Sequence, residues 1–217
     1  MPDCSRLSTL DSQLSVGGIV LCGGRSSRMG RPKAWLPFGE ETMLQRVVRT
    51  LGEVVSPIVV VAAPDQDVPP VPDGVRIVRD EQEGLGPLAG LAAGLSALKG
   101  IADAAFASSC DVPLLTPAFV RAVINHLDGF DLAIPREDGY HHPLAAVYRT
   151  SLGEMCAALL AEGRRRPLDL VRASNSCEFD VGELRPADPD LASLRNANTP
   201  EEYVALLNRA GFAPPAE

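Results

Sequence analysis

A loop between residues 21 and 33 gathers the residue types that hold phosphate. It reads Leu21-Cys22-Gly23-Gly24-Arg25-Ser26-Ser27-Arg28-Met29-Gly30-Arg31-Pro32-Lys33, with three glycines, three arginines and one lysine. Glycine lets the backbone turn sharply and bring its N–H groups close to an anion, while arginine and lysine neutralise the charge. This basic cluster is out of character in a chain of formal net charge -8. A solvated turn would have a similar composition, so the loop alone predicts only an anion site.

Two well-known phosphate loops are excluded. The segment contains neither G-x-x-x-x-G-K-[ST] nor G-x-G-x-x-G, because Ala34 follows Lys33 where the first pattern needs Ser or Thr. The loop therefore belongs to neither the P-loop nor the dinucleotide-binding class.

Asp111 follows a short apolar run, Ala104–Ser108, and precedes Val112-Pro113. An aspartate at the carboxyl end of a buried strand is well placed to hold Mg²⁺ against phosphate oxygens. The alternative is an aspartate that caps the turn before Pro113. No Ser-His-Asp or Cys-His arrangement that would supply a nucleophile is evident in the sequence.

The elements that position these residues alternate between strand and helix up to residue 127. We expect buried strands at 18–22, 57–63, 75–78 and 104–108, with helices that carry the apolar series from Met43 to Val55 and from Leu88 to Leu98. Thr116-Pro117 and Thr199-Pro200 are strong helix starts, and Glu202 completes a capping box with Thr199. We further expect strands at 131–134, 144–148 and 177–181 and a helix near 152–160.

This alternation predicts an α/β fold with a Rossmann-like, doubly wound, mostly parallel sheet in a single domain. We expect that domain at residues 17–210, after a flexible N-terminal tail at residues 1–16. Few aromatic residues (5%) and many aliphatic ones agree with a parallel sheet covered by helices.

Composition narrows the possible partners and the compartment. The acidic balance argues against a general nucleic-acid binder, and no apolar run approaches the ~20 residues that span a membrane. The five cysteines are scattered with no C-x-x-C pair, and residues 1–16 lack a signal-peptide layout. We expect a cytoplasmic protein.

The loop resembles the N-terminal signature of the molybdenum cofactor nucleotidyltransferases, L-x-G-G-x-S-x-R-M-G-x-x-K. More broadly, it is similar to nucleotidyltransferases built on a Rossmann-like sheet, of the nucleotide-diphospho-sugar transferase type. Gly23-Gly24 and Arg28-Met29-Gly30 look most like the guanylyltransferase branch, whereas the cytidylyltransferase branch typically shows A-A-G and R-F-G there. The resemblance covers roughly residues 17–208.

Three further segments carry the same resemblance. Gly86-Pro87-Leu88-Ala89-Gly90 matches a G-P-L-A-G segment beside the guanine base, Asp80 matches an acidic nucleotide contact, and Asn196-Ala197-Asn198-Thr199-Pro200-Glu201 matches N-x-N-T-P-E/D at the active site. Glu81 competes with Asp80 for its role. Taken together, the resemblance implies nucleotide, metal or acceptor contacts at Leu21, Cys22, Gly23, Gly24, Lys33, Asp80, Pro87, Leu88, Gly90, Asp111, Asn196 and Asn198.

The sequence does not assign a role to three further sites. His142, before Pro143, matches a segment on the second-substrate side, but a lone histidine is more often structural. Arg164–Arg166 could meet an acceptor phosphate or simply lie at a solvated helix end. Guanylyltransferases can carry an asparagine after the second strand, where this chain has Ala62-Ala63. A nucleotide or ribose contact is therefore absent there or is made by backbone.

The resemblance implies transfer of GMP from GTP to molybdopterin with release of pyrophosphate. Arg28 and Lys33 would stabilise charge on the phosphates and Asp111 would hold Mg²⁺. Proteins that deliver molybdopterin, or molybdoenzymes that receive the product, are the protein partners it suggests. The alternatives are cytidylyl transfer, another phosphate acceptor, or a non-catalytic nucleotide-binding chaperone.

Overall fold

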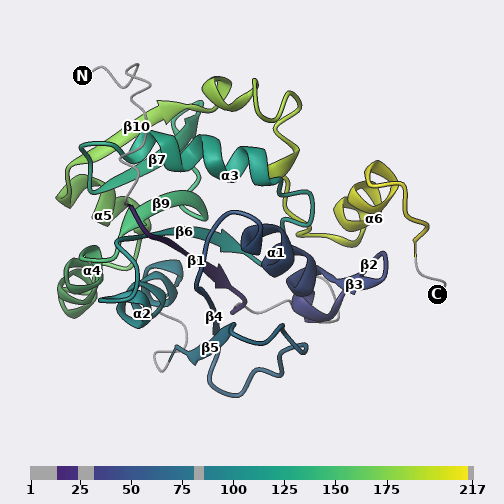
Figure 1. Cartoon of the computed structure of the whole chain (residues 1–217), viewed down its shortest axis with the longest axis horizontal. Helices are drawn as coiled ribbons and strands as arrows, with labels where there is room; N and C mark the ends of the chain where they lie inside the picture. Colours follow the sequence, from purple (N-terminus) through teal and green to yellow (C-terminus); the bar gives the residue numbers. More distant parts are fainter. Residues whose placement is uncertain (1–13, 24–31, 81–85, 215–217) are drawn as a thin grey trace.

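A computed structural model describes residues 14–23, 32–80 and 86–214, and its centre is one twisted sheet (Figure 1). The strands of this sheet are β1 (Val16–Leu21), β4 (Ile58–Ala62), β5 (Arg76–Arg79), β6 (Ala104–Ser109), β7 (Leu132–Glu137), β8 (Tyr140–His141), β9 (Ala145–Arg149) and β10 (Ser176–Asp180). Their order is β10-β7-β9-β6-β1-β4-β5, and β8 pairs with β7. A separate ribbon joins β2 (Pro37–Phe38) to β3 (Glu41–Thr42).

Parallel pairing dominates the sheet. β1 pairs in parallel with β4 on one side and β6 on the other, and only β8 and β9 run antiparallel to their described neighbours. The predicted doubly wound, mostly parallel sheet is confirmed. Because β1, β6 and β4 share one direction, their carboxyl ends meet at one edge, where ligands of such folds bind.

Six α-helices accompany the sheet in the described ranges. They are α1 (Met43–Gly52), α2 (Pro87–Leu98), α3 (Pro117–Ile124), α4 (Leu152–Ala161), α5 (Pro167–Ala173) and α6 (Pro200–Arg209), and single turns of 3₁₀-helix occur at η1 (Lys33–Trp35), η2 (Asn125–Leu127), η3 (Val181–Leu184) and η4 (Ala192–Leu194). The predicted helices are all present. The capping box of Thr199 and Glu202 and the N-cap of Thr116 are confirmed as well.

Two apolar clusters cover the two faces of the sheet. On one face, α1 and α3 contribute Leu44, Val47 and Phe119 to the core, all at most 1% exposed. On the other face, the buried side of α2 packs with α4 and α5 against β1, β4 and β9. Burying each large aliphatic side chain contributes roughly 1.5–3 kcal/mol, so these two layers supply most of the fold's stability.

A third cluster lies beside the sheet and joins α6 to the β2–β3 ribbon (Figure 1). The ring of Phe212 meets the ring of Phe38 edge-on, with 5.4 Å between centroids, and the guanidinium of Arg46 lies 5.0 Å from the Phe38 centroid. The hydroxyl of Tyr203 donates to the carbonyl oxygen of Pro37. The C-terminal helix is thus fixed to the segment that follows Lys33.

Some elements were not predicted from the sequence. The ribbon β2–β3, the short strand β8 and helix α5 have too few residues for a clear hydrophobic period. Strand β1 begins two residues before the predicted start and ends at Leu21, so Cys22 lies just beyond it. Ser15 is already hydrogen-bonded, through its backbone N–H and its hydroxyl, to Asp103 Oδ2 at 2.9 and 2.7 Å.

The close contact between α2 and β1 requires a residue without a side chain at Gly94. A Cβ atom there would lie 2.7 Å from Cγ2 of Ile19. We expect Gly94→Ala to lower the free energy of unfolding by about 1–3 kcal/mol, because a packed core resists added volume. Urea unfolding followed by circular dichroism measures the change.

Gly52→Ala is the matched control, since its Cβ would meet nothing closer than Cδ1 of Ile58 at 3.7 Å. This variant should be as stable as the natural chain or gain up to about 1 kcal/mol from helix propensity. Equal stability of the two variants would contradict the packing argument for Gly94.

Candidate functional site

Asp111 lies two residues beyond the end of β6 and is the hub of a polar network. The ammonium of Lys33 donates to Oδ2 of Asp111 at 2.7 Å, and the amide of Asn196 donates to Oδ1 at 2.9 Å. The same Lys33 ammonium also donates to Oδ1 of Asn198 at 2.9 Å. Lys33 and Asn196 therefore meet at the carboxylate of Asp111, and Asn198 joins the network through Lys33.

The backbone around Ala197 explains why two asparagines two residues apart both face the site. They lie in the stretch between η4 and α6, on either side of Ala197, which is fully buried and whose N–H donates to the carbonyl oxygen of Asp111 at 2.9 Å. In an extended chain, side chains two residues apart point to the same side. Burial of Ala197 thus turns both asparagine amides toward Asp111 and Lys33.

The described part of the phosphate loop begins at the end of β1. The N–H of Cys22 donates to the carbonyl oxygen of Val61 at 2.8 Å, and Gly23 is exposed at the edge of the sheet. Leu21 is buried and packs under Gly90, where a Cβ would meet Leu21 Cδ2 at 3.2 Å. Gly24, Arg25 and Arg28 lie outside the described residues, so their predicted roles stay predictions.

Gln66 joins the carboxyl ends of β1 and β4. Its amide donates to the carbonyl oxygen of Cys22 at 2.9 Å, and its Oε1 accepts from the N–H of Ala63 at 3.1 Å. Gln66 therefore places a side-chain amide beside Ala62-Ala63, the position at which guanylyltransferases can carry an asparagine. Sequence reasoning missed it because an isolated glutamine in a polar loop gives no signal.

Ser109 is the second residue that sequence reasoning missed. Its hydroxyl donates to Oδ1 of Asp111 at 2.5 Å. The available signal was a pair of serines, Ser108 and Ser109, at the end of a strand whose preceding residues are all apolar. A buried hydroxyl must find a partner, and here that partner is the carboxylate.

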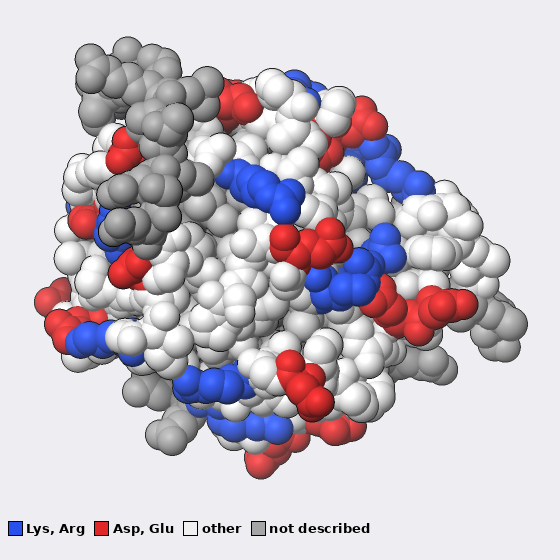
Figure 2. All heavy atoms as spheres, viewed as in Figure 1, with Lys and Arg blue, Asp and Glu red and all other residues white. Residues whose placement is uncertain are grey.

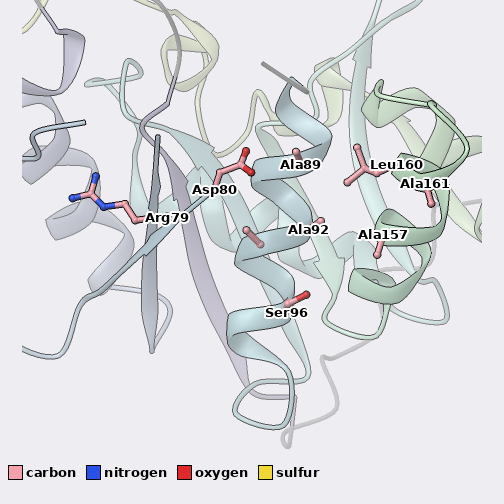
Figure 3. A pocket seen from close by; sticks show the side chains of 9 residues that line it. Arg79, Asp80, Ala89, Ala92, Ser96, Ala157, Leu160 and Ala161 are labelled. Atoms are coloured by element: carbon pink, nitrogen blue, oxygen red, sulfur yellow. The ribbon is translucent and has the colours of Figure 1, made fainter. Parts of the chain in front are cut away.

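Asp80 and the start of α2 form a second region. Asp80 follows β5, and its N–H donates to the carbonyl oxygen of Ala62 at 2.9 Å. Its side chain points toward α2 near Ala89, at one end of a groove of about 510 Å³ between β5, α2 and α4 (Figure 3). Arg79 also lines the groove, but its side chain points away from α2 and donates to the carbonyl oxygen of Ala63 at 2.9 Å.

The G-P-L-A-G segment forms the start of α2, and its Ala89 lines the groove. Pro87 is exposed at the first position of α2, whereas Leu88 is fully buried and Gly90 is buried against Leu21. Leu88 therefore faces the core, and a ligand would meet this residue through its backbone. Glu81, the competitor of Asp80, lies outside the described residues.

His142 and the arginine run lie further along the molecule. Burial lowers the pKa of His142, and its Nε2 has no hydrogen-bond partner among the described residues. Arg164 follows α4 and pairs with Asp169 of α5 at 3.3 Å, while the carbonyl oxygen of Arg165 would lie 3.6 Å from a Cβ at Gly86. The arginine run thus reaches the start of α2, and roles for these residues stay predictions.

The cysteines around the site are buried thiols. Cys22 and Cys110 follow the neighbouring strands β1 and β6, and each is 5% exposed. The hydrogen bond with Cys22, together with burial, holds the pKa of the Cys110 thiol well above its usual value. The thiolate is the nucleophilic form of cysteine, and both the hydrogen bond with Cys22 and burial favour the protonated form of Cys110.

The donor set at Asp111 suits a hard divalent cation shared with a phosphate ligand. The described residues contain no cluster of three or more His, Cys, Asp or Glu side chains that could hold a metal by themselves. Mg²⁺ is commonly held by one or two carboxylates together with substrate phosphates. A single carboxylate with two amide groups beside a phosphate loop fits that arrangement.

Surface charge on the face seen in Figure 1 is mixed. Lysine and arginine side chains alternate with aspartate and glutamate side chains over this face (Figure 2). An interspersed pattern is not the continuous basic area of a nucleic-acid binder. Among the described helices, none is both long and apolar enough to cross a lipid bilayer.

The fold and the site together define a nucleotidyltransferase. The end of β1, Lys33 and the Asp111 carboxylate lie at the carboxyl edge of a mostly parallel sheet, and the family model described as "MobA-like NTP transferase domain" matches residues 18–176. The chain belongs to the family of MobA-like NTP transferases. Nucleotidyltransferases of this family generally use a divalent metal.

Named relatives are similar in sequence to this protein over most of the chain. A protein of Mycobacterium avium, named a probable molybdenum cofactor guanylyltransferase, is 39% identical over 89% of this chain and 95% of its own length. One of Mycobacterium bovis with the same name is 38% identical over 79% of this chain and 86% of its own. The crystal structure of molybdopterin-guanine dinucleotide biosynthesis protein A from Archaeoglobus fulgidus has the same fold, with a TM-score of 0.74, 22% identity and coverage of 90% and 98% of the two chains.

The bridge made by Gln66 can be tested by mutation. Gln66→Ala removes the hydrogen bond that joins the loops after β1 and β4, from the Gln66 amide to the carbonyl oxygen of Cys22. It also removes the bond from the N–H of Ala63 that orients the glutamine within its own loop, so the chain after β1 loses a support at Cys22. We expect affinity for GTP, measured by isothermal titration calorimetry, to fall about three- to tenfold, the equivalent of one or two neutral hydrogen bonds. Asp65→Ala, an exposed change in the same turn, should leave it unaltered. Equal affinities for GTP in the two variants would refute the bridging role.

Proposed function

We propose that this protein transfers GMP from GTP to molybdopterin and releases pyrophosphate, forming the guanine dinucleotide form of the cofactor. The names of relatives at 38–39% identity support the reaction. The observation that carries the proposal is the network in which Lys33, Asn196 and Asn198 surround Asp111 beside the phosphate loop. A module for binding alone would not need this carboxylate.

The reaction needs positioning and charge neutralisation more than a nucleophilic side chain. A phosphate oxygen of the acceptor forms a bond to the α-phosphorus of GTP, the α–β phosphoanhydride bond breaks, and pyrophosphate leaves. Lys33 would donate hydrogen bonds to the phosphates as charge shifts to the leaving group. Arg28 would add a bidentate contact, and Asn196 and Asn198 would orient the carboxylate and the lysine.

Asp111 would hold the divalent cation, with Mg²⁺ as the proposed ion, through the oxygen that Lys33 contacts at 2.7 Å. A cation bound there supplies positive charge to the phosphate oxygens. Lys33, whose ammonium donates to that oxygen in the structure, would then donate to the phosphates instead.

Preference for guanine is proposed from the segment at the start of α2 and from Asp80. A carboxylate can accept hydrogen bonds from N1–H and the 2-amino group of guanine, and cytosine lacks that pair of donors. Asp80 points toward α2 near Ala89 (Figure 3), and both residues line the same groove. Cytidylyl transfer to the same acceptor is the nearest rival.

We propose that the protein acts in the cytoplasm. Proteins that deliver molybdopterin or receive the finished dinucleotide would be its partners. A non-catalytic chaperone for the cofactor is disfavoured by the intact network at Asp111.

Asp111→Asn tests the metal role. The amide keeps the shape of the side chain but loses the negative charge, so the variant should bind GTP without metal and lose at least about 100-fold in kcat. Radiolabelled GTP, Mg²⁺ and molybdopterin measure the transfer. Asp103→Asn, at the opposite end of β6, is the control for loss of one carboxylate and should stay active. Full activity of Asp111→Asn would remove this residue from the metal role.

The same assay tests which nucleotide the protein transfers and whether molybdopterin accepts it. With GTP and CTP in parallel, we expect transfer from GTP to exceed transfer from CTP by at least about 100-fold, as a site built to pair with base donors discriminates. Transfer from CTP at an equal or higher rate would refute the guanylyl proposal. Binding of GTP with no transfer to molybdopterin would favour the chaperone.

A further inference from the structure

Ser109 is the last residue of β6 and pairs in register with Leu21 of β1. The residue is 9% exposed, and its hydroxyl donates to Oδ1 of Asp111 at 2.5 Å. The amide of Asn196 donates to the same oxygen at 2.9 Å and lies 3.5 Å from the Ser109 hydroxyl. Two donors from separate parts of the chain therefore converge on one carboxylate oxygen.

This convergence distinguishes the two oxygens of Asp111. Rotation about the last side-chain torsion of an aspartate is soft and nearly two-fold, so an unsupported carboxylate exchanges its oxygens readily. With Oδ1 held by Ser109 and Asn196, Oδ2 is the oxygen that faces Lys33. Hydrogen bonds to charged groups are stronger than neutral ones, so this orientation is well held.

We propose that Ser109 is a positioning residue of the transfer reaction: it fixes the Asp111 carboxylate so that Oδ2 alone is presented to the cation. The inference rests on the proposed function. Ser109 touches neither substrate nor cation and acts through Asp111. Groups that orient a ligating carboxylate typically change metal affinity or activity by 10–100-fold when they are removed.

The adjacent residue supplies a matched control. Ser108 lies on the same strand and is fully buried, and its hydroxyl donates to the carbonyl oxygen of Ser109 at 3.3 Å. Successive side chains of a strand point to opposite faces, so Ser108 and Ser109 do not share an environment. Removing either hydroxyl deletes one buried oxygen from β6, but only removal of the Ser109 hydroxyl takes away one of the two donors that hold Oδ1 of Asp111.

The test compares Ser109→Ala, Ser109→Thr and Ser108→Ala in the full-length protein. Electron paramagnetic resonance of Mn²⁺ measures cation affinity in the presence of GTP, and calorimetry measures GTP affinity without metal. In Ser109→Ala we expect Mn²⁺ affinity and kcat each to fall about tenfold, with metal-free GTP affinity within about twofold of the natural chain. Ser109→Thr keeps the hydroxyl and should restore both values, and Ser108→Ala should alter neither.

Natural values of Mn²⁺ affinity and kcat in Ser109→Ala would overturn the proposal, as would equal losses in Ser108→Ala. Ser109 would instead have a general structural role if Ser109→Ala lost as much metal-free GTP affinity as Mn²⁺ affinity. The same conclusion would follow if Ser109→Ala were less stable but still bound Mn²⁺ at natural strength. The Mn²⁺ measurement needs no acceptor. If the natural chain transfers no GMP, the proposed function fails, while the cation affinities of the variants still decide the role of Ser109.

Discussion

The carboxylate of Asp111 is the point on which the arrangement of this protein depends. It receives Lys33 on one oxygen and Ser109 and Asn196 on the other, and its side chain is only 11% exposed. A charge this far from water is costly unless it is paired and hydrogen-bonded. The segments that carry its partners must therefore come together, and their meeting defines the site.

Two layers of packing make that meeting possible. The parallel pairing of β1 and β6 brings Cys22 and Gly23, just after β1, and Asp111 to one edge of the sheet. Helix α6 then holds the asparagines there, because Tyr203 bonds to Pro37 and Phe212 packs on Phe38. The third apolar cluster thus joins the residues after Lys33 to the residues after Asn198, so the lysine and both asparagines share one frame. Positioning of this kind suits phosphoryl chemistry, which needs fixed charges more than a reactive side chain.

Much of the fold followed from the residues alone. Apolar runs closed by turn residues gave the buried strands, and Thr-Pro pairs gave two helix starts, because hydrophobic period and capping are local properties. The ribbon β2–β3, strand β8 and helix α5 did not follow, since elements of two to seven residues are formed by their neighbours more than by their own pattern. Leu88 lies in a segment that matches a nucleotide-contacting segment of the family, yet its side chain is fully buried on the inner face of α2.

The sequence by itself determined the class of the protein: the basic glycine loop, the aspartate after a buried strand and the paired asparagines are each readable as short motifs. It could not determine how these motifs combine. The tertiary structure decided that Asn196 donates to Oδ1 of Asp111 while Asn198 accepts from Lys33. It also decided that Ser109 and Gln66 support the site. The reason is physical: these contacts join residues up to 165 positions apart, and only the packing of sheet and α6 sets the distances between them.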